Sequence, residues 1–247
     1  MRYLVKFSYD GSCFNGFQRQ DDLKTVQGVM EKALFSLTGE EIKLCASGRT
    51  DKGVHAFRQY AHFDTLKEFK LYNLKKYLNN SFSGEIYVYD VEIVPISFHA
   101  RYSAKRKKYV YYLNMGGYSP IFRNYCFQYC KKLNVSLMKE ASRYLIGEHD
   151  FRSFVTDGKE KDNCKRIIYD IDFEVNDDIL KITFEGTGFL RKMIRNIVGI
   201  LILIGALEKP VSYIKEVLDL KMRTGNLKCA FAGGLYLEDV YYGDDVV

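Results

Sequence analysis

Hydrophobic and polar positions follow two periods along the chain, one helical and one strand-like. Between Val26 and Leu37, apolar residues recur every three to four positions, which predicts a helix with Thr25 as its N-cap. The same spacing predicts further helices over residues 72–80, 135–146 and 190–204. Strand-like runs are predicted over residues 3–9, 42–47, 56–64, 86–94, 100–113, 164–175, 179–184 and 235–241.

The order of these elements indicates the fold class. The first half runs strand-helix-strand-strand-helix-strand, which is the order of a split βαβ, ferredoxin-like unit. The second half repeats this order loosely, without a sequence repeat or a low-complexity linker between the halves. We therefore expect an α+β fold in which two ferredoxin-like halves, residues 1–97 and 98–247, share a mainly antiparallel sheet flanked by helices. Two independent α+β domains are the alternative.

Composition narrows the class of protein. The chain has 247 residues, of which 47% are hydrophobic and 28% charged, as is ordinary for a soluble globular protein. The net charge of +6 is modest for a nucleic-acid binder, so the distribution of charge matters more than its sum. The longest apolar run, residues 197–207, is too short to span a membrane and suits a buried helix.

The cysteines and histidines do not predict a metal site. Six cysteines are scattered without a Cys-x-x-Cys pair, and the four histidines do not cluster with them along the sequence. We therefore expect no metal, and free thiols in a reducing cytoplasm.

Residues 48–53 place two glycines, Arg49 and Asp51 on a short turn between two predicted strands. A turn is where a scaffold can present a working side chain. Taken alone, the spacing favours a hairpin corner in which Asp51 caps its own turn.

Two further stretches carry candidate chemistry. The first contains five basic side chains and no acid, and leads into interleaved tyrosines: Arg101, Lys105, Arg106, Lys107 and Lys108. These suit phosphate contacts and base stacking, or equally a charge-protected edge strand. The second is a helix in which Arg195 lies beside the buried stripe, and its pattern alone favours an ordinary amphipathic helix with a basic face.

Three motifs together resemble the tRNA pseudouridine synthase A family. They are Gly-Arg-Thr-Asp-Lys-Gly-Val-His-Ala at 48–56, the basic run with Tyr-x-Tyr at 109–111, and Met-Ile-Arg-Asn-Ile-Val-Gly at 193–199. Weaker matches at both ends extend the resemblance over nearly the whole length. The chain departs from the family at Phe231, where Ala-Phe-Ala stands in place of Ala-Pro-Ala.

The resemblance implies the pseudouridine synthase fold and an isomerase that converts uridine to pseudouridine on the 3′ side of the tRNA anticodon stem-loop. By this resemblance, Asp51 is the essential catalytic residue and Arg195 pairs with Asp51. Tyr109 is the active-site tyrosine, and Leu235 lines the uridine pocket. We expect Arg49 to fill the position left by a flipped-out base or to hold a phosphate.

The resemblance also implies the partners. They are tRNA and a second copy of the chain, with RNA contacting both subunits and no cofactor. Two alternatives remain open. One is a paralogue of the same family acting on ribosomal RNA, and the other is an RNA-binding protein without catalysis.

Overall fold

The computed structural model describes residues 1–155, 163–222 and 227–243. The chain divides into a first unit, Met1–Lys107 together with the chain from Tyr236 on, and a second unit, Lys108–Leu235. The boundaries fall inside two strands, β5 (Arg106–Asn114) and β10 (Leu235–Tyr241), which carry the chain from one unit to the other. The structure consists of strands flanked by helices, which confirms the expected α+β class.

The first unit is built on a mixed sheet with the strand order β4-β1-β3-β10. Strand β1 (Arg2–Tyr9) pairs antiparallel with β3 (His55–Asp64) on one side and with β4 (Ile86–Val94) on the other. Strand β10 runs parallel to β3. The short β2 (Cys45–Ala46) pairs antiparallel with β3 near the C-terminal end of β3. The loop from β2 to β3 is the one that contains the predicted turn.

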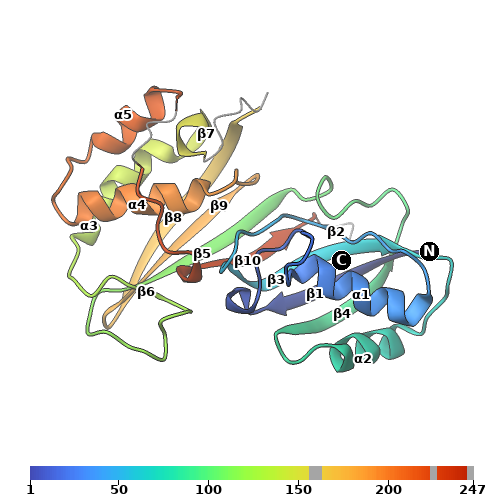
Figure 1. Cartoon of the computed structure of the whole chain (residues 1–247). Helices are drawn as coiled ribbons and strands as arrows, with labels where there is room; N and C mark the ends of the chain where they lie inside the picture. Colours follow the sequence, from blue (N-terminus) through green and yellow to red (C-terminus); the bar gives the residue numbers. More distant parts are fainter. Residues whose placement is uncertain (156–162, 223–226, 244–247) are drawn as a thin grey trace. The chain divides into compact units, whose positions relative to one another are not determined.

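Two helices pack on this sheet, α1 (Val26–Thr38) and α2 (Leu71–Ser81), as Figure 1 shows. Helix α1 begins where Thr25 accepts a hydrogen bond from the backbone of Gly28, as its sequence predicts. Leu34, Leu74 and Leu78 are buried beneath the helices. Each such side chain contributes about 1.5–3 kcal/mol when it is removed from water.

The second unit has the strand order β5-β9-β8-β7. Strands β8 (Lys165–Asn176) and β9 (Ile179–Gly186) form the expected hairpin, and β7 (Gly147–Asp150) pairs antiparallel with β8. The short β6 (Phe127–Gln128) runs parallel to β5.

Three helices complete the second unit: α3 (Val135–Ser142), α4 (Met193–Gly205) and α5 (Tyr213–Asp219). Nearly every residue of α4 is buried, which confirms the buried helix predicted from the long apolar run. Among the helices of the described chain, none is long and apolar enough to cross a membrane.

The strand predicted within residues 100–113 is β5, which starts at Arg106. The preceding residues 95–105 form a loop held by hydrogen bonds from the Arg2 guanidinium to the carbonyls of Ile96 and Phe98. Helix α4 starts at Met193 rather than at residue 190, because Lys192 has a left-handed φ of 61° that no helix continues through.

A polar cluster lies in the first unit where β2, β3 and the loop of residues 95–105 meet. Cys45, His62 and His99 each place one potential ligand atom within 4.8 Å of the others, so the cysteine and histidines that are separate in sequence are close in space. The Nδ1 atoms of His62 and His99 accept hydrogen bonds from the backbones of Ala100 and Arg101, at 3.1 Å each. A metal-bound neutral imidazole needs its second nitrogen to donate, so these bonds do not match the surroundings of a metal ligand.

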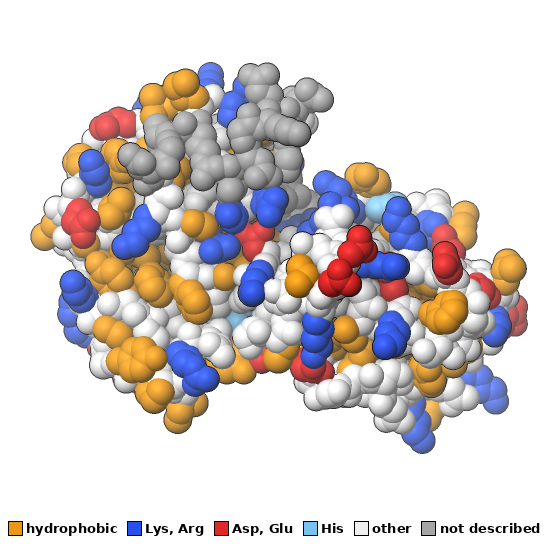
Figure 2. Space-filling model, viewed as in Figure 1, with side chains coloured by type: hydrophobic (Ala, Val, Ile, Leu, Met, Phe, Trp, Pro, Cys, Tyr) orange, Lys and Arg blue, Asp and Glu red, His pale blue; other side chains and the backbone are white. Residues whose placement is uncertain are grey.

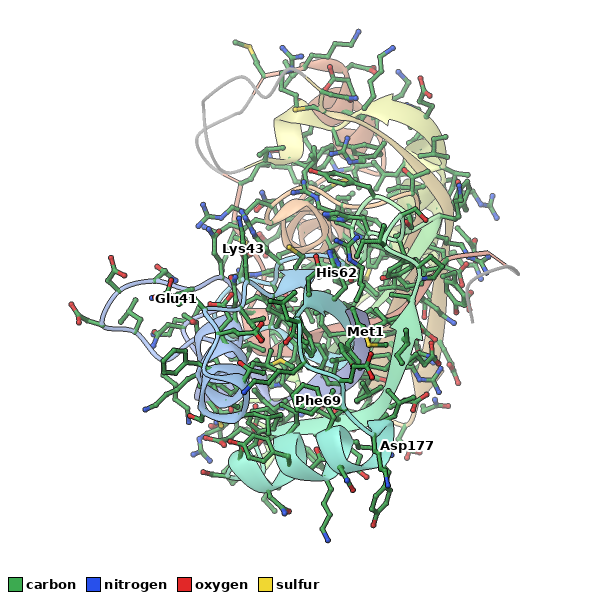
Figure 3. The ribbon with its side chains drawn as sticks, turned by 90° about the vertical axis from the view of Figure 1, so that its right-hand side faces the viewer. Met1, Glu41, Lys43, His62, Phe69 and Asp177 are labelled. Carbon is green, nitrogen blue, oxygen red and sulfur yellow. The ribbon has the colours of Figure 1, made fainter. Side chains whose placement is uncertain are left out.

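His62 is buried within the first unit (Figure 3), and this burial has the largest effect on its pKa. Burial, together with the positive charges of Arg2 and His99, lowers the pKa of His62 to about 4. The fold therefore holds the ring in its neutral form, while the unfolded chain takes up a proton near its ordinary pKa of 6.5. Stability from this residue is present above pH 6.5 and is lost as the pH falls from there toward 4.

We predict that His62→Gln flattens this pH dependence, because glutamine cannot take up a proton but can still accept from the backbone. Between pH 7.5 and pH 5, the wild type is expected to lose about 2 kcal/mol more of its free energy of unfolding than the variant. Urea unfolding at the two pH values measures the difference. Equal losses in the two proteins would show that His62 does not titrate in this way.

Candidate active site

Asp51 lies on the loop between β2 and β3 in the first unit, where the sequence predicts it. Its side chain is half-buried, and the backbone N–H of Val54 donates to the Asp51 carbonyl at 3.1 Å to close the turn. Gly53 has a φ of 80°, which an L side chain rarely adopts. The turn is therefore a fixed piece of backbone that ends directly at β3.

A buried glutamine holds the start of this loop. Gln59 on β3 accepts from the Ser47 hydroxyl at 2.6 Å and donates to the carbonyl of Gly48 at 3.0 Å. Both Gln59 and Ser47 are fully buried, so neither bond competes with water. The chain entering the turn is thereby fixed to the strand that leaves it.

Tyr9 at the end of β1 and the segment that follows it also support the turn that contains Asp51. The Tyr9 hydroxyl lies 2.8 Å from the Thr50 hydroxyl, and the backbone N–H of Phe17 donates to the Thr50 carbonyl at 3.1 Å. A Cβ atom at Gly16 would lie 3.3 Å from the backbone of both Thr50 and Lys52, and Gly16 itself has a φ of 93°. The residues on both sides of Asp51 are thus packed backbone against backbone.

His55 supports the end of the loop. It is 2% exposed, its Nδ1 accepts the backbone N–H of Gly11 at 3.0 Å, and its ring stacks on Tyr236 at 4.6 Å. These contacts agree with the structural role that the sequence favours for this histidine.

Tyr109, Arg195 and Leu235 belong to the second unit. Tyr109 lies on β5, is 8% exposed, and makes an edge contact with the ring of Phe189 at 5.3 Å. Leu235 is buried at the start of β10. The structure thus assigns the expected catalytic aspartate to one unit, and the expected tyrosine, arginine and pocket leucine to the other.

Arg195 is tied to the segment that precedes β10 by two hydrogen bonds with one residue. Its Nε donates to the Ala230 carbonyl at 2.8 Å, and its own carbonyl accepts from the Ala230 N–H at 3.0 Å. A Cβ atom at Gly199, one turn further along α4, would lie 1.9 Å from the Lys228 carbonyl, so only glycine allows this approach. Because Nε is used in this contact, the guanidinium plane is oriented by the protein.

Tyr111 holds the next residue of this segment. It is fully buried, and its hydroxyl donates to the Phe231 carbonyl at 2.8 Å. Burial raises the pKa of Tyr111 well above its usual value, and the positive charge of Arg195 opposes that rise only in part. The hydroxyl therefore stays protonated and serves as a permanent donor two residues after Tyr109.

The basic run does not act as one exposed patch. Arg101, Lys105 and Arg106 are exposed, and the Arg106 guanidinium lies 4.4 Å from the ring centroid of Tyr241. Lys107, however, donates to the Ser47 carbonyl at 2.6 Å, and Lys108 lies 3.7 Å from Glu185. Arg49, on the turn itself, is exposed.

Comparison with known proteins identifies the family. The family model of tRNA pseudouridine synthases matches residues 6–103 and 141–243. The chain belongs to the tRNA pseudouridine synthase family. The matched residues include Asp51, Arg195 and Leu235, whereas Tyr109 lies between the two matched ranges.

Individual relatives match over nearly their whole length. The tRNA pseudouridine synthase A of Thermoanaerobacter sp. (strain X514) is 40% identical over 240 residues, covering 97% of this chain and 98% of the relative. The protein of the same name from Streptococcus agalactiae serotype Ia is 40% identical over 248 positions, covering 99% of this chain and 96% of the relative. Among solved structures, a Cbf5-Nop10-Gar1 complex contains a chain with a TM-score of 0.34 and 14% identity, covering 79% of this chain and 46% of that one.

Sequence reasoning missed the residues that hold the expected site in place. Gln59 and Tyr111 act through hydrogen bonds to backbone carbonyls, and Tyr9 through a hydrogen bond with the Thr50 hydroxyl; these partners are distant in sequence, and no local pattern shows them. The only signal was indirect, since Tyr9 and Tyr111 lie within stretches that resemble the family's opening and its Tyr-x-Tyr motif.

We predict that Tyr111→Phe lowers turnover more than it lowers affinity for tRNA. The change removes the donor to the part-buried Phe231 carbonyl, which costs about 1 kcal/mol and loosens the segment that orients Arg195. Thermal unfolding, tRNA binding and the rate constant of the reaction are measured for each variant.

Tyr242→Phe is the matched control, because Tyr242 is also a buried tyrosine whose hydroxyl donates to a carbonyl, that of Ala100, at 2.8 Å. It should lose similar stability but keep its turnover. If Tyr111→Phe turns over as fast as this control, the hydroxyl does not position the site.

Proposed function

We propose that this protein isomerises uridine to pseudouridine in tRNA, on the 3′ side of the anticodon stem-loop. The observation that carries the proposal is the family match over most of the chain, which includes the stretch where Asp51 lies on its supported turn. Relatives that carry the name tRNA pseudouridine synthase A match over nearly their whole length and support the same substrate.

The reaction breaks the bond between uracil N1 and ribose C1′, turns the base, and joins C5 to C1′. No electron transfer or phosphoryl transfer occurs, so we propose that the chemistry is carried out by side chains without a cofactor. The carboxylate of Asp51 either attacks C1′ as a nucleophile or removes the proton on C2′. Both routes need it to be ionised and held still, and the hydrogen bonds around its turn supply the second requirement.

Arg195 and Tyr109 have separate roles in this proposal. Arg195 pairs with the ionised carboxylate of Asp51 through a two-pronged contact that fixes the orientation of the carboxylate. Its oriented guanidinium plane supports this role. The hydroxyl of Tyr109 removes the proton from C5 late in the reaction, after the new carbon–carbon bond has formed.

The target uridine has to leave its stem to reach these groups, so we propose base flipping. Leu235 lines the pocket that receives the base, and Arg49 fills the vacated position or holds the adjacent phosphate. Arg101, Lys105 and Arg106 contact phosphates directly. Lys107 and Lys108 add to the positive potential, although each also has a contact within the protein.

We further propose that the protein acts in the cytoplasm as a homodimer, with RNA contacting both subunits. These assignments rest on the family resemblance alone. No specific observation favours ribosomal RNA as the substrate or RNA binding without catalysis.

We predict that Asp51→Asn abolishes isomerisation while tRNA affinity stays close to that of the wild type. The change keeps the size of the side chain and removes the charge that either route requires, so the rate should fall by at least about 1000-fold. The assay is tritium release from C5-labelled uridine in unmodified tRNA, with binding measured separately.

Asp170→Asn is the control, because Asp170 is an exposed aspartate on β8 in the second unit. It should release tritium at the wild-type rate. An Asp51→Asn protein that also does so would overturn the proposed function.

A further inference from the structure

Phe231 is an exposed aromatic side chain on a segment whose backbone is fixed. Its φ and ψ angles are −55° and 136°, which are values that proline also adopts. The segment therefore has a backbone shape that is compatible with the Ala-Pro-Ala of the family. The substitution changes the side chain, and 43% of the phenylalanine surface is exposed.

The ring is supported on its protein side. It packs against Phe127 at a centroid distance of 6.2 Å, and it lies so close to Gly233 that a Cβ atom there would be 2.7 Å from Phe231 Cε1. The same Cβ would be 2.2 Å from the carbonyl of Asn124, so the loop before β6 supports Gly233 in turn. Figure 2 shows further hydrophobic side chains exposed on the surface of the second unit.

The position of the ring relates it to the expected site within the same unit. The preceding residue, Ala230, exchanges two hydrogen bonds with Arg195. The Phe231 carbonyl is held by Tyr111, and Leu235 follows four residues later. The exposed ring is thus attached directly to the backbone that orients the arginine and leads to the pocket leucine.

We propose that Phe231 is a stacking platform for a base of the substrate RNA that neighbours the target uridine. The inference rests on the proposed function. When a nucleotide is flipped out of a stem, the bases beside it lose a stacking partner, and that cost opposes flipping. An aromatic ring with a supported side and an exposed surface replaces this partner without selecting a particular base.

The chemistry favours an RNA base over an apolar protein surface at this position. Arg195 is hydrogen-bonded to Ala230, the residue before Phe231, and its cationic guanidinium disfavours an apolar partner there. Base–aromatic stacking is also sequence-tolerant, so Phe231 supplies affinity and leaves the choice of uridine to the pocket.

Phe231→Pro is the most direct test, because proline keeps the observed φ and removes the ring. Affinity for unmodified tRNA is expected to fall by roughly 5- to 100-fold, the range for loss of one stacked base. Phe231→Leu keeps apolar contact with Phe127 but has no aromatic face, so it should weaken binding similarly. Wild-type affinity in either variant that unfolds at the wild-type temperature would overturn the proposal.

A tryptophan at this position reports the contact itself. The chain contains no tryptophan, so Phe231→Trp introduces a single tryptophan, whose fluorescence can be excited apart from that of the tyrosines. Unmodified tRNA should quench it in a saturable manner with near-wild-type affinity. Tyr169→Trp, at an exposed tyrosine on β8 in the same unit, is the matched control and should show little change.

The outcomes separate this inference from the proposed function. If the wild type releases tritium from tRNA but Phe231→Trp fluorescence does not respond to tRNA, the stacking role is wrong and the function stands. If the fluorescence changes with protein concentration in the absence of RNA, the ring contacts a second copy instead, and the proposal is wrong. If tRNA quenches the fluorescence of Phe231→Trp but the wild type releases no tritium, the proposed function fails while the stacking contact stands.

Discussion

The paired hydrogen bonds between Arg195 and Ala230 are the interaction on which the second unit's part of the candidate site depends. They join the first turn of α4 to the segment that becomes β10, and they commit Nε of the arginine to a protein carbonyl. Gly199 allows the two backbones to meet, and Tyr111 secures the next carbonyl. A long, flexible side chain thereby acquires one orientation before any substrate binds, which is the condition for electrostatic stabilisation without reorganisation.

In the first unit, hydrogen bonds and close backbone packing restrict the position of Asp51. A carboxylate on a turn is accessible but mobile, unless the turn is held on both sides. Here Gln59 holds its start, while Tyr9 and the close approach of Gly16 hold its middle. Burial raises the pKa of Tyr9 to about 12, so its hydroxyl also remains a neutral hydrogen-bonding group. Neutral side chains, together with Lys107 at the Ser47 carbonyl, thus fix the loop around the one residue whose charge the proposed chemistry requires.

The sequence predicted those parts of the fold that depend on local periodicity. Strands β1, β4 and β10 and helix α1 lie close to their predicted ranges, because their apolar positions repeat with the period of the element. The late start of α4 follows from the left-handed Lys192, for which the sequence carries no signal. The short elements β7 and α5 have too few residues for a period to show.

The sequence predicted the residues of the candidate site but not the hydrogen bonds that hold them in place. Motifs and family resemblance indicated Asp51, Tyr109 and Arg195, and these roles remain predictions. Resemblance could not show which side chains hold the backbone, because Tyr111 and Ala230 meet their partners across more than thirty residues of sequence. Resemblance also could not show that Phe231 has a backbone conformation that proline adopts, since this depends on φ and not on residue type.

We propose that Asp51 and Arg195, which belong to different units, act as one catalytic group. A double-mutant cycle tests it most directly, with single-turnover tritium release measured for the wild type, Asp51→Asn, Arg195→Ala and the double variant. If the two residues act together, the double variant should be little slower than Asp51→Asn alone. Rate losses that multiply in the double variant would show that the two residues act independently, and would contradict this account.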